Sequence, residues 1–256
     1  MCSSDLVTLK VNDKPSPDGA REVVIRPIGS EGELRYNEWV ERNRQRIEKE
    51  FHGRVGYVHV PDTAMGGLTE FGKGFYSQVD KDALIVDERF NSGGFIPDFF
   101  VERLSRKLLS IATPRYGIDF SSPGAALYGP KVILADEWSG SGGDAFPYFF
   151  RKAGVGPIIG KRTWGGLVGI SDDIPLLDGG GVTVPQFGLW SPQDGKWIAE
   201  NHGVDPDIEV DNTPDKMLNG ADPQLERAIE YIREQLKHSP PKRHQHPPFP
   251  VEKLNK

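Results

Sequence analysis

Two glycine-rich segments, each placed directly after a short apolar run, constrain this chain more than any other feature. The run 131–135 has the length of a buried strand and leads into 136–150, where two serines stand among glycines. The run 83–86 leads into 87–94, which ends in Asn-Ser-Gly-Gly, and a helical pattern follows over 96–111. Strand, glycine-rich turn and helix therefore occur twice in succession. This order predicts an α/β fold whose mixed, largely parallel sheet is flanked by helices.

The two glycine-rich segments are expected to share one site. Ligand sites in parallel sheets lie at the carboxyl ends of the strands, and both 87–94 and 139–144 fall there. A serine on such a strand-to-helix turn is exposed, beside backbone N–H groups that have no partner within the helix. A competing interpretation is a flexible loop that caps a helix, with Asp144 in the first turn. Asp87 and Arg89 could form a buried pair that shapes the first segment, or they could contact a substrate.

Three functions fit these segments to different degrees. In a serine hydrolase, Ser141 would attack a carbonyl, and the N–H groups of Gly142 and of Gly94 or Gly93 would hold the oxyanion. In a binding module, the same turns would hold a carboxylate or a peptide terminus without turnover. Phosphate binding is excluded, because the sequence has no Gly-Lys-Ser/Thr motif and no metal-ligand spacing.

Composition narrows the class of protein. The net charge is −6 and the basic residues are scattered, so nucleic-acid binding gains no support. No apolar run has the length of a membrane span, and the first residues lack the pattern of a signal peptide. The single cysteine, Cys2, fits a reducing compartment. We therefore expect a cytoplasmic protein with no membrane or nucleic-acid partner and no cofactor or metal requirement.

The pattern along the chain predicts four parts. Residues 1–33 contain two strand-like segments and a turn, too small to fold alone, and are expected to end a β domain whose upstream part is missing. Residues 34–52 carry one apolar stripe and are predicted to form a linker helix. The core follows over 53–238, and the Pro-, Lys- and His-rich tail 239–256 is predicted to be disordered.

Four motifs carry a resemblance to a known family. The motifs are Val86–Gly94, Glu137–Asp144, Gly160–Gly166 and Glu200–Asp207. Together they closely resemble the catalytic region of the tricorn-type serine peptidases. Those enzymes belong to peptidase family S41, which also includes the C-terminal processing proteases. The resemblance runs from about Gly53 to Leu236, with the motifs in family order. It implies a ClpP/crotonase-like core, a PDZ-like origin for residues 1–33, peptide substrates, and a homo-oligomer in the full-length form.

The resemblance also implies residue roles. The nucleophile of the family matches Ser141 and not Ser139. Its oxyanion donors match the N–H groups of Gly94 and Gly142. Its carboxylate, which orients the charge relay through a serine, matches Glu200. We further place Gly93 and Ala112 at the substrate-binding surface.

The catalytic base and the specificity residue depart from the family pattern. The lysine base of the processing proteases would fall near Gly166, and Lys161 lies outside that position. The tricorn branch uses a histidine from an upstream Ser-His pair, which none of the six histidines here matches: His52, His59, His202, His238, His244 and His246. Ala112 stands where the family has an aspartate that favours basic substrates. We therefore expect a weak or inactive peptidase when this chain is alone; the alternative is a non-catalytic, peptide-binding remnant.

Overall fold

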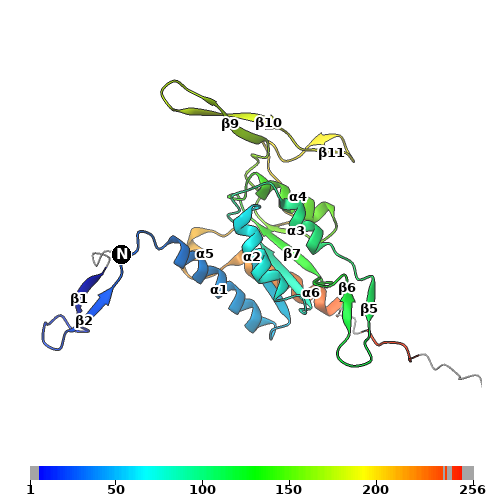
Figure 1. Cartoon of the computed structure of the whole chain (residues 1–256), viewed down its shortest axis with the longest axis horizontal. Helices are drawn as coiled ribbons and strands as arrows, with labels where there is room; N and C mark the ends of the chain where they lie inside the picture. Colours follow the sequence, from blue (N-terminus) through cyan, green and yellow to red (C-terminus); the bar gives the residue numbers. More distant parts are fainter. Residues whose placement is uncertain (1–5, 239, 241–243, 250–256) are drawn as a thin grey trace, which may run out of the picture. The chain divides into compact units, whose positions relative to one another are not determined.

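The computed structural model describes residues 6–238, 240 and 244–249 (Figure 1). The chain divides into two compact units, with the boundary between Arg42 and Asn43. The predicted disordered tail, 239–256, falls largely outside the described residues.

The first unit contains an antiparallel hairpin. Strands β1 (Val7–Val11) and β2 (Arg21–Ile25) pair with Val7 opposite Ile25. The side chains of both strands are mostly exposed. Helix α1 (Gly32–Glu50) begins in this unit and crosses the boundary. The two strands and the helix form as predicted, whereas the PDZ-like origin of residues 1–33 and the linker role of the helix stay predictions.

The second unit is built on a parallel sheet, in the order β13-β8-β7-β4-β3. All neighbouring strands in it are parallel. Its strands are β3 (Val55–His59), β4 (Ala83–Asp87), β7 (Lys131–Ala135), β8 (Ile158–Gly160) and β13 (Ile208–Glu209). Every residue of β3, β4, β7 and β8 is buried, as expected for a sheet covered on both faces. The predicted α/β class is thus confirmed.

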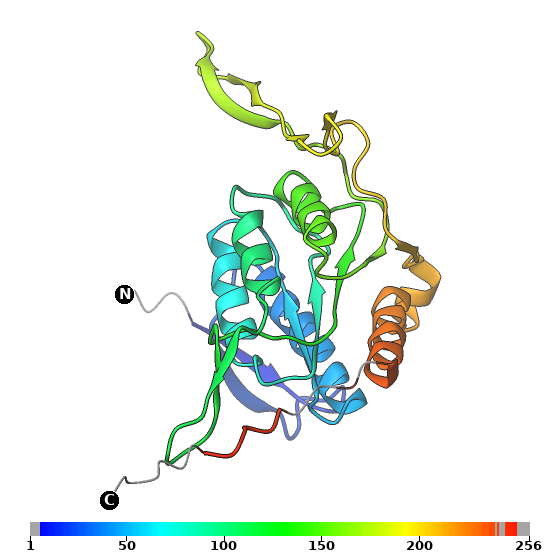
Figure 2. The ribbon, with the colours of Figure 1, turned by 90° about the vertical axis from the view of Figure 1, so that its right-hand side faces the viewer.

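Helices cover the two faces of this sheet differently (Figure 2). On one face lie α2 (Met65–Tyr76), α3 (Pro97–Leu104) and α4 (Gly142–Lys152), joined by a cluster of aromatic rings. On the other face, α6 (Pro223–His238) packs against β4, β7 and β8. The aromatic cluster fixes α3 and α4 against each other, and both helices start at the carboxyl end of a strand.

The outer edge of strand β3, which has no neighbouring strand among the described residues, is hydrogen-bonded by a side chain. The Gln78 amide accepts a hydrogen bond from the Tyr57 N–H (3.1 Å) and donates one to the Tyr57 carbonyl (2.9 Å). A glutamine thus replaces the next strand at an edge that would otherwise offer unpaired backbone groups.

The remaining strands form hairpins outside the central sheet. These are β5 (Ser110–Ala112) with β6 (Phe120–Ser122), β9 (Gly169–Pro175) with β10 (Gly181–Phe187), and β11 (Trp190–Ser191) with β12 (Lys196–Trp197); a short helix, α5 (Pro214–Leu218), precedes α6. Pro185 lies in β10, and the β9–β10 register shifts on both sides of it, as expected for a proline that makes its strand an edge or a bulged one.

One predicted helix was too long. The helical pattern over 96–111 ends in the structure at Leu104, and Ser110 begins strand β5. The Leu109 N–H donates to the Ser122 carbonyl, so pairing with β6 takes over there. Apolar residues at helical spacing also suit a strand, and tertiary pairing decides between the two.

Candidate active site

The first turn (residues 87–94, after β4) and the second turn (residues 136–144, after β7) meet at the carboxyl edge of the sheet. Ser141 lies in the second turn, directly before the first residue of α4, with φ 57° and ψ −116°. Non-glycine residues seldom adopt a positive φ, and such strain is typical of functional sites. The sharp turn directs the Ser141 side chain into a cavity.

Asp144 holds the second turn in shape. Its buried carboxylate accepts hydrogen bonds from the N–H groups of Ser141 (2.8 Å), Gly165 (2.8 Å) and Gly166 (3.2 Å), and from the Thr163 hydroxyl. Burial raises the pKa of Asp144, and these hydrogen bonds oppose that shift. Because its oxygens are committed to these donors, Asp144 serves the turn rather than the proton chemistry of Ser141.

The two serines of the second turn have different surroundings. Ser139 is buried, and its hydroxyl lies 3.0 Å from the Glu88 carbonyl and 3.1 Å from the Asp136 carboxylate. Ser141 lines the cavity instead. This contrast favours Ser141 over Ser139 as a nucleophile.

The predicted proximity of the two turns is confirmed. A Cβ atom added to Gly93 would lie 2.7 Å from the Ser141 Cβ. One added to Gly142 would lie 2.8 Å from the Gly94 nitrogen. The turns can approach this closely only because glycine occupies both positions.

Two backbone donors next to Ser141 are unpaired. Within the described part of the chain, neither the Gly94 N–H nor the Gly142 N–H donates to a protein acceptor. Such donors are available to water or to a ligand, and Gly142 supplies one because it opens helix α4. They could therefore stabilise negative charge that develops beside Ser141.

Ser141 and Glu200 face neighbouring cavities. The first, of about 350 Å³, is lined by Ser141, Gly94 and Gly142 among others. The second, of about 500 Å³, is lined by Glu200 and by apolar residues of β10 and its surroundings. Phe187 and Leu189 line both cavities, so the two cavities adjoin, and we call them the two halves of the cleft.

Glu200 is fixed by backbone donors. One oxygen of its carboxylate accepts from the N–H groups of Leu167 (2.8 Å) and Val168 (2.6 Å). The Asn201 N–H donates to the Gly165 carbonyl, so the Glu200 loop is tied to the segment that Asp144 also holds. Asp144 and Glu200 thereby fix the geometry between the two halves of the cleft.

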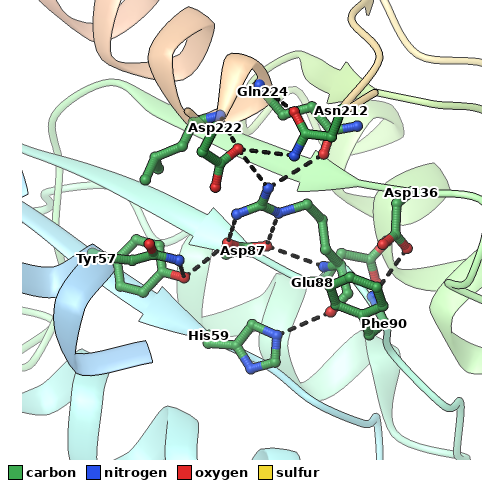
Figure 3. A network of polar contacts seen from close by, with 12 residues as sticks. Tyr57, His59, Asp87, Glu88, Phe90, Asp136, Asn212, Asp222 and Gln224 are labelled. Carbon is green, nitrogen blue, oxygen red and sulfur yellow. Dashed lines mark hydrogen bonds and ion pairs between the residues drawn. The ribbon is translucent and has the colours of Figure 1, made fainter. Parts of the chain in front are cut away.

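A buried network of ion pairs and hydrogen bonds holds the first turn in place (Figure 3). The Arg89 guanidinium contacts both oxygens of Asp87 (2.6 and 2.9 Å) and one of Asp222 (2.8 Å), and the Tyr57 hydroxyl donates to Asp87 (2.8 Å). Burial alone would raise the pKa of Asp87, but the Arg89 charge reverses this and keeps that pKa below its ordinary value. Asp87 and Arg89 are thus a buried structural pair, without access to a substrate.

Comparison with known proteins identifies the family. The model of peptidase family S41 matches residues 54–210. The chain belongs to peptidase family S41. It is therefore classed with the serine-type peptidases.

Relatives within this family cover most of the chain. The tricorn protease of Thermoplasma acidophilum is 39% identical over 217 residues, which are 85% of this chain and 20% of that protein. A Sulfurisphaera tokodaii protein, described as a tricorn-like protease C-terminal subunit, is 40% identical over 92% of this chain and 27% of its own length. A crystal structure of the tricorn protease matches with a TM-score of 0.80 and 39% identity, over 85% of this chain and 21% of that one. The chain thus spans only between a fifth and somewhat over a quarter of these relatives.

The described histidines lie outside the cleft. Among the described residues that line either half of the cleft, none is a histidine. His59 is buried in β3, where burial lowers its pKa, and its ring lies 2.9 Å from the Arg89 carbonyl. His202 is exposed and lies 2.9 Å from Asp205.

Of the two residues predicted to bind substrate, one lies at the cleft and the other does not. Gly93 lies against Ser141, but Ala112 lies on strand β5 and lines neither half of the cleft. The residues of the cleft walls, such as Leu167, Phe187 and Leu189, were not found from the sequence. No motif marks them, because they come from a hairpin and a loop that reach Ser141 only in the folded chain.

Neither a membrane-spanning helix nor a cluster of metal-ligating side chains is found among the described residues. Among the helices of the described residues, none combines the length and the apolar character that a membrane span requires. In the same part of the chain, no three His, Cys, Asp or Glu side chains converge so as to hold a metal ion.

Proposed function

We propose that this chain carries the nucleophile, oxyanion donors and carboxylate of a tricorn-type serine endopeptidase. Ser141 attacks the peptide carbonyl, and the N–H groups of Gly94 and Gly142 stabilise the oxyanion that forms. The observation that carries this proposal is the pair of unpaired N–H groups beside a strained, cavity-lining Ser141. Peptide substrates, assembly into a homo-oligomer in the full-length form, and a cytoplasmic location belong to the same proposal.

Glu200 orients the group that accepts the proton of Ser141. Its carboxylate faces the second half of the cleft, which adjoins the half that holds Ser141. A base located there would lie beside Glu200 and adjoin the half that Ser141 lines. The resemblance to the tricorn branch assigns that base to a histidine in a separate Ser-His segment. Without it, Ser141 loses most of its activation, and the oxyanion donors support only a residual rate.

Chemical rescue tests this proposal. A peptidyl-coumarin substrate is incubated with the chain and with its Ser141→Ala variant, with and without added imidazole as a substitute base. We expect very slow release of coumarin from the chain alone and a rate that rises with imidazole. In Ser141→Ala, only the imidazole background should remain. If the chain hydrolyses the substrate rapidly without imidazole, and Ser141→Ala abolishes this activity, the proposal that the chain lacks a base is wrong.

A non-catalytic, peptide-binding remnant is the second candidate. The absence of a histidine from the described cleft walls favours it. A fluorophosphonate probe separates the two candidates, because it reacts with an activated serine. Labelling of Ser141 in the presence of imidazole supports the peptidase. Peptide binding without any labelling under those conditions supports the remnant.

A further inference from the structure

The half-cleft at Ser141 has an apolar wall on helix α4. Ser141, Ala145 and Phe149 follow one another at intervals of four residues and therefore lie on one face of the helix. Ala145 is buried, and it packs with Leu167 and Ile198 in a small apolar cluster. A side chain that enters beside Ser141 would contact this face.

A second wall comes from β10 and from the segments just before β9 and just after β10. Leu167, Phe187 and Leu189 line it. Glu200 holds the N–H of Leu167, so the carboxylate of the proposed charge relay also fixes this wall. A Cβ atom added to Gly169 would lie 2.3 Å from the Phe187 ring, which places that ring directly against the backbone of β9.

Two exposed aromatic rings stand together at this half-cleft. The rings of Phe95 and Phe187 have centroids 6.4 Å apart, although the two residues are 76% and 50% exposed. Phe95 directly follows the donor Gly94. When the carbonyl oxygen of a substrate residue binds the Gly94 N–H, the side chain of that residue therefore lies next to this pair of rings.

Charge is nearly absent from this half-cleft. Among the described residues that line it, Asp98 alone is charged, and Asp98 is exposed in the first turn of α3. An exposed carboxylate contributes at most about fivefold to binding of a cation. Burial of a large apolar side chain contributes about tenfold or more. The apolar walls therefore dominate the selection.

We propose that this half-cleft selects a large apolar side chain, aromatic or aliphatic, at the residue whose carbonyl Ser141 attacks. The inference rests on the proposed function, because it assumes that a peptide carbonyl binds at Gly94 and Gly142. Phe187 and Leu189 are then the residues that determine specificity, and Asp98 contributes little to it.

Binding of product-like peptides tests this selectivity without any need for turnover. The probes are fluorescein-labelled Gly-Gly-X tripeptides with a free carboxylate, where X is Phe, Leu, Ala, Lys or Asp. Fluorescence anisotropy with the unmodified chain gives each dissociation constant. We expect the Phe and Leu peptides to bind about tenfold more tightly than the Ala peptide, and the Lys and Asp peptides no more tightly than Ala.

Variants on the β9–β10 hairpin and α3 identify the responsible wall. Phe187→Ala is expected to reduce the preference for Phe over Ala by about fivefold, and Leu189→Ala to reduce the preference for Leu. Ile170→Ala is the matched control, because Ile170 is an exposed apolar residue of the same hairpin that lines neither half of the cleft. Asp98→Asn is expected to leave the preference for Phe unchanged.

The outcomes separate this inference from the proposed function. Equal binding of all peptides, or tighter binding of the Lys peptide that Asp98→Asn abolishes, overturns the selectivity but leaves the peptidase proposal intact. An unchanged preference in both Phe187→Ala and Leu189→Ala also overturns it. Failure of every peptide to bind would overturn the selectivity together with the peptide site on which it rests.

Discussion

The two turns that flank the cleft are held by different means. The first turn is fixed by the buried Arg89, which bridges Asp87 and the distant Asp222 at the start of α6. The second turn is fixed by carboxylates that accept backbone N–H groups, chiefly Asp144. The first therefore depends on long-range charge pairing. The second depends on hydrogen bonds to an acceptor within its own sequence.

This difference separates stability from site geometry. Loss of Arg89 would leave two buried charges unpaired, a cost to the whole fold. Loss of the Asp144 charge would release the backbone around Ser141 and affect the site more than the fold. Four substitutions, from the largest expected effect to the smallest, test this contrast.

Arg89→Leu should destabilise the protein most. It leaves Asp87 and Asp222 without their buried cation, and we expect a loss of about 3–5 kcal/mol in the free energy of unfolding. Urea unfolding measures it. Arg233→Leu is the control, because the side chains of Arg233 and its partner Glu50 are each 43% exposed, and a loss below about 1 kcal/mol is expected. Equal losses in both variants would show that the network does not stabilise the first turn.

Asp144→Asn should disturb the site with a smaller loss of stability. The amide keeps one acceptor but turns a donor toward the N–H groups and the hydroxyl that Asp144 binds. We expect a loss of about 2–3 kcal/mol and the loss of imidazole-dependent labelling of Ser141. Glu137→Gln on the same turn is exposed and should change neither quantity. Full labelling in Asp144→Asn would contradict this role.

Lys131→Met tests the opposite end of strand β7, away from both turns. Burial lowers the pKa of Lys131 from 10.5 to about 8. Between these pH values the unfolded chain binds a proton that the folded chain does not, so stability should rise with pH from about 8 to 10.5. The variant should lack this rise and should be the more stable protein at neutral pH. Imidazole-dependent labelling of Ser141 should stay unchanged. If the free energies of unfolding of the two proteins change with pH in parallel, Lys131 is not the titrating group.

Glu88→Gln should have the smallest effect at low pH, and its size depends on pH. Both oxygens of the buried Glu88 side chain lack a hydrogen-bond partner in the described residues. Burial first, and then the charges of Asp136, Asp144 and Asp87, raise its pKa well above 4.5. The folded state therefore keeps a proton that the unfolded state loses, so stability falls as pH rises above 4.5 toward the folded pKa.

The glutamine variant should lack that fall. Urea unfolding across a pH series should give similar stabilities near pH 4.5 and a more stable variant at higher pH. If the variant instead loses stability by a constant amount at every pH, Glu88 is not the titrating group.

The sequence allowed prediction of features that lie within short segments. The strands β4 and β7, the glycine-rich turns and the candidate Ser141 were all predictable, because each rests on a few consecutive residues. The end of α3 was missed, since the apolar spacing over 96–111 also suits the strand β5. The roles of Ser141, Gly94, Gly142 and Glu200 stay predictions until activity is measured.

The sequence by itself determined the α/β class, the glycines at positions where two turns meet, and the choice of a serine within a strand-to-helix turn. Only the tertiary structure decided that Ser139 is buried while Ser141 lines a cavity, that Arg89 reaches Asp222, and that Phe187 and Leu189 form a wall. The physical reason is the order of strands in the sheet. It brings together residues far apart in the chain, and burial, charge pairing and cavity shape depend on those contacts rather than on neighbours in sequence.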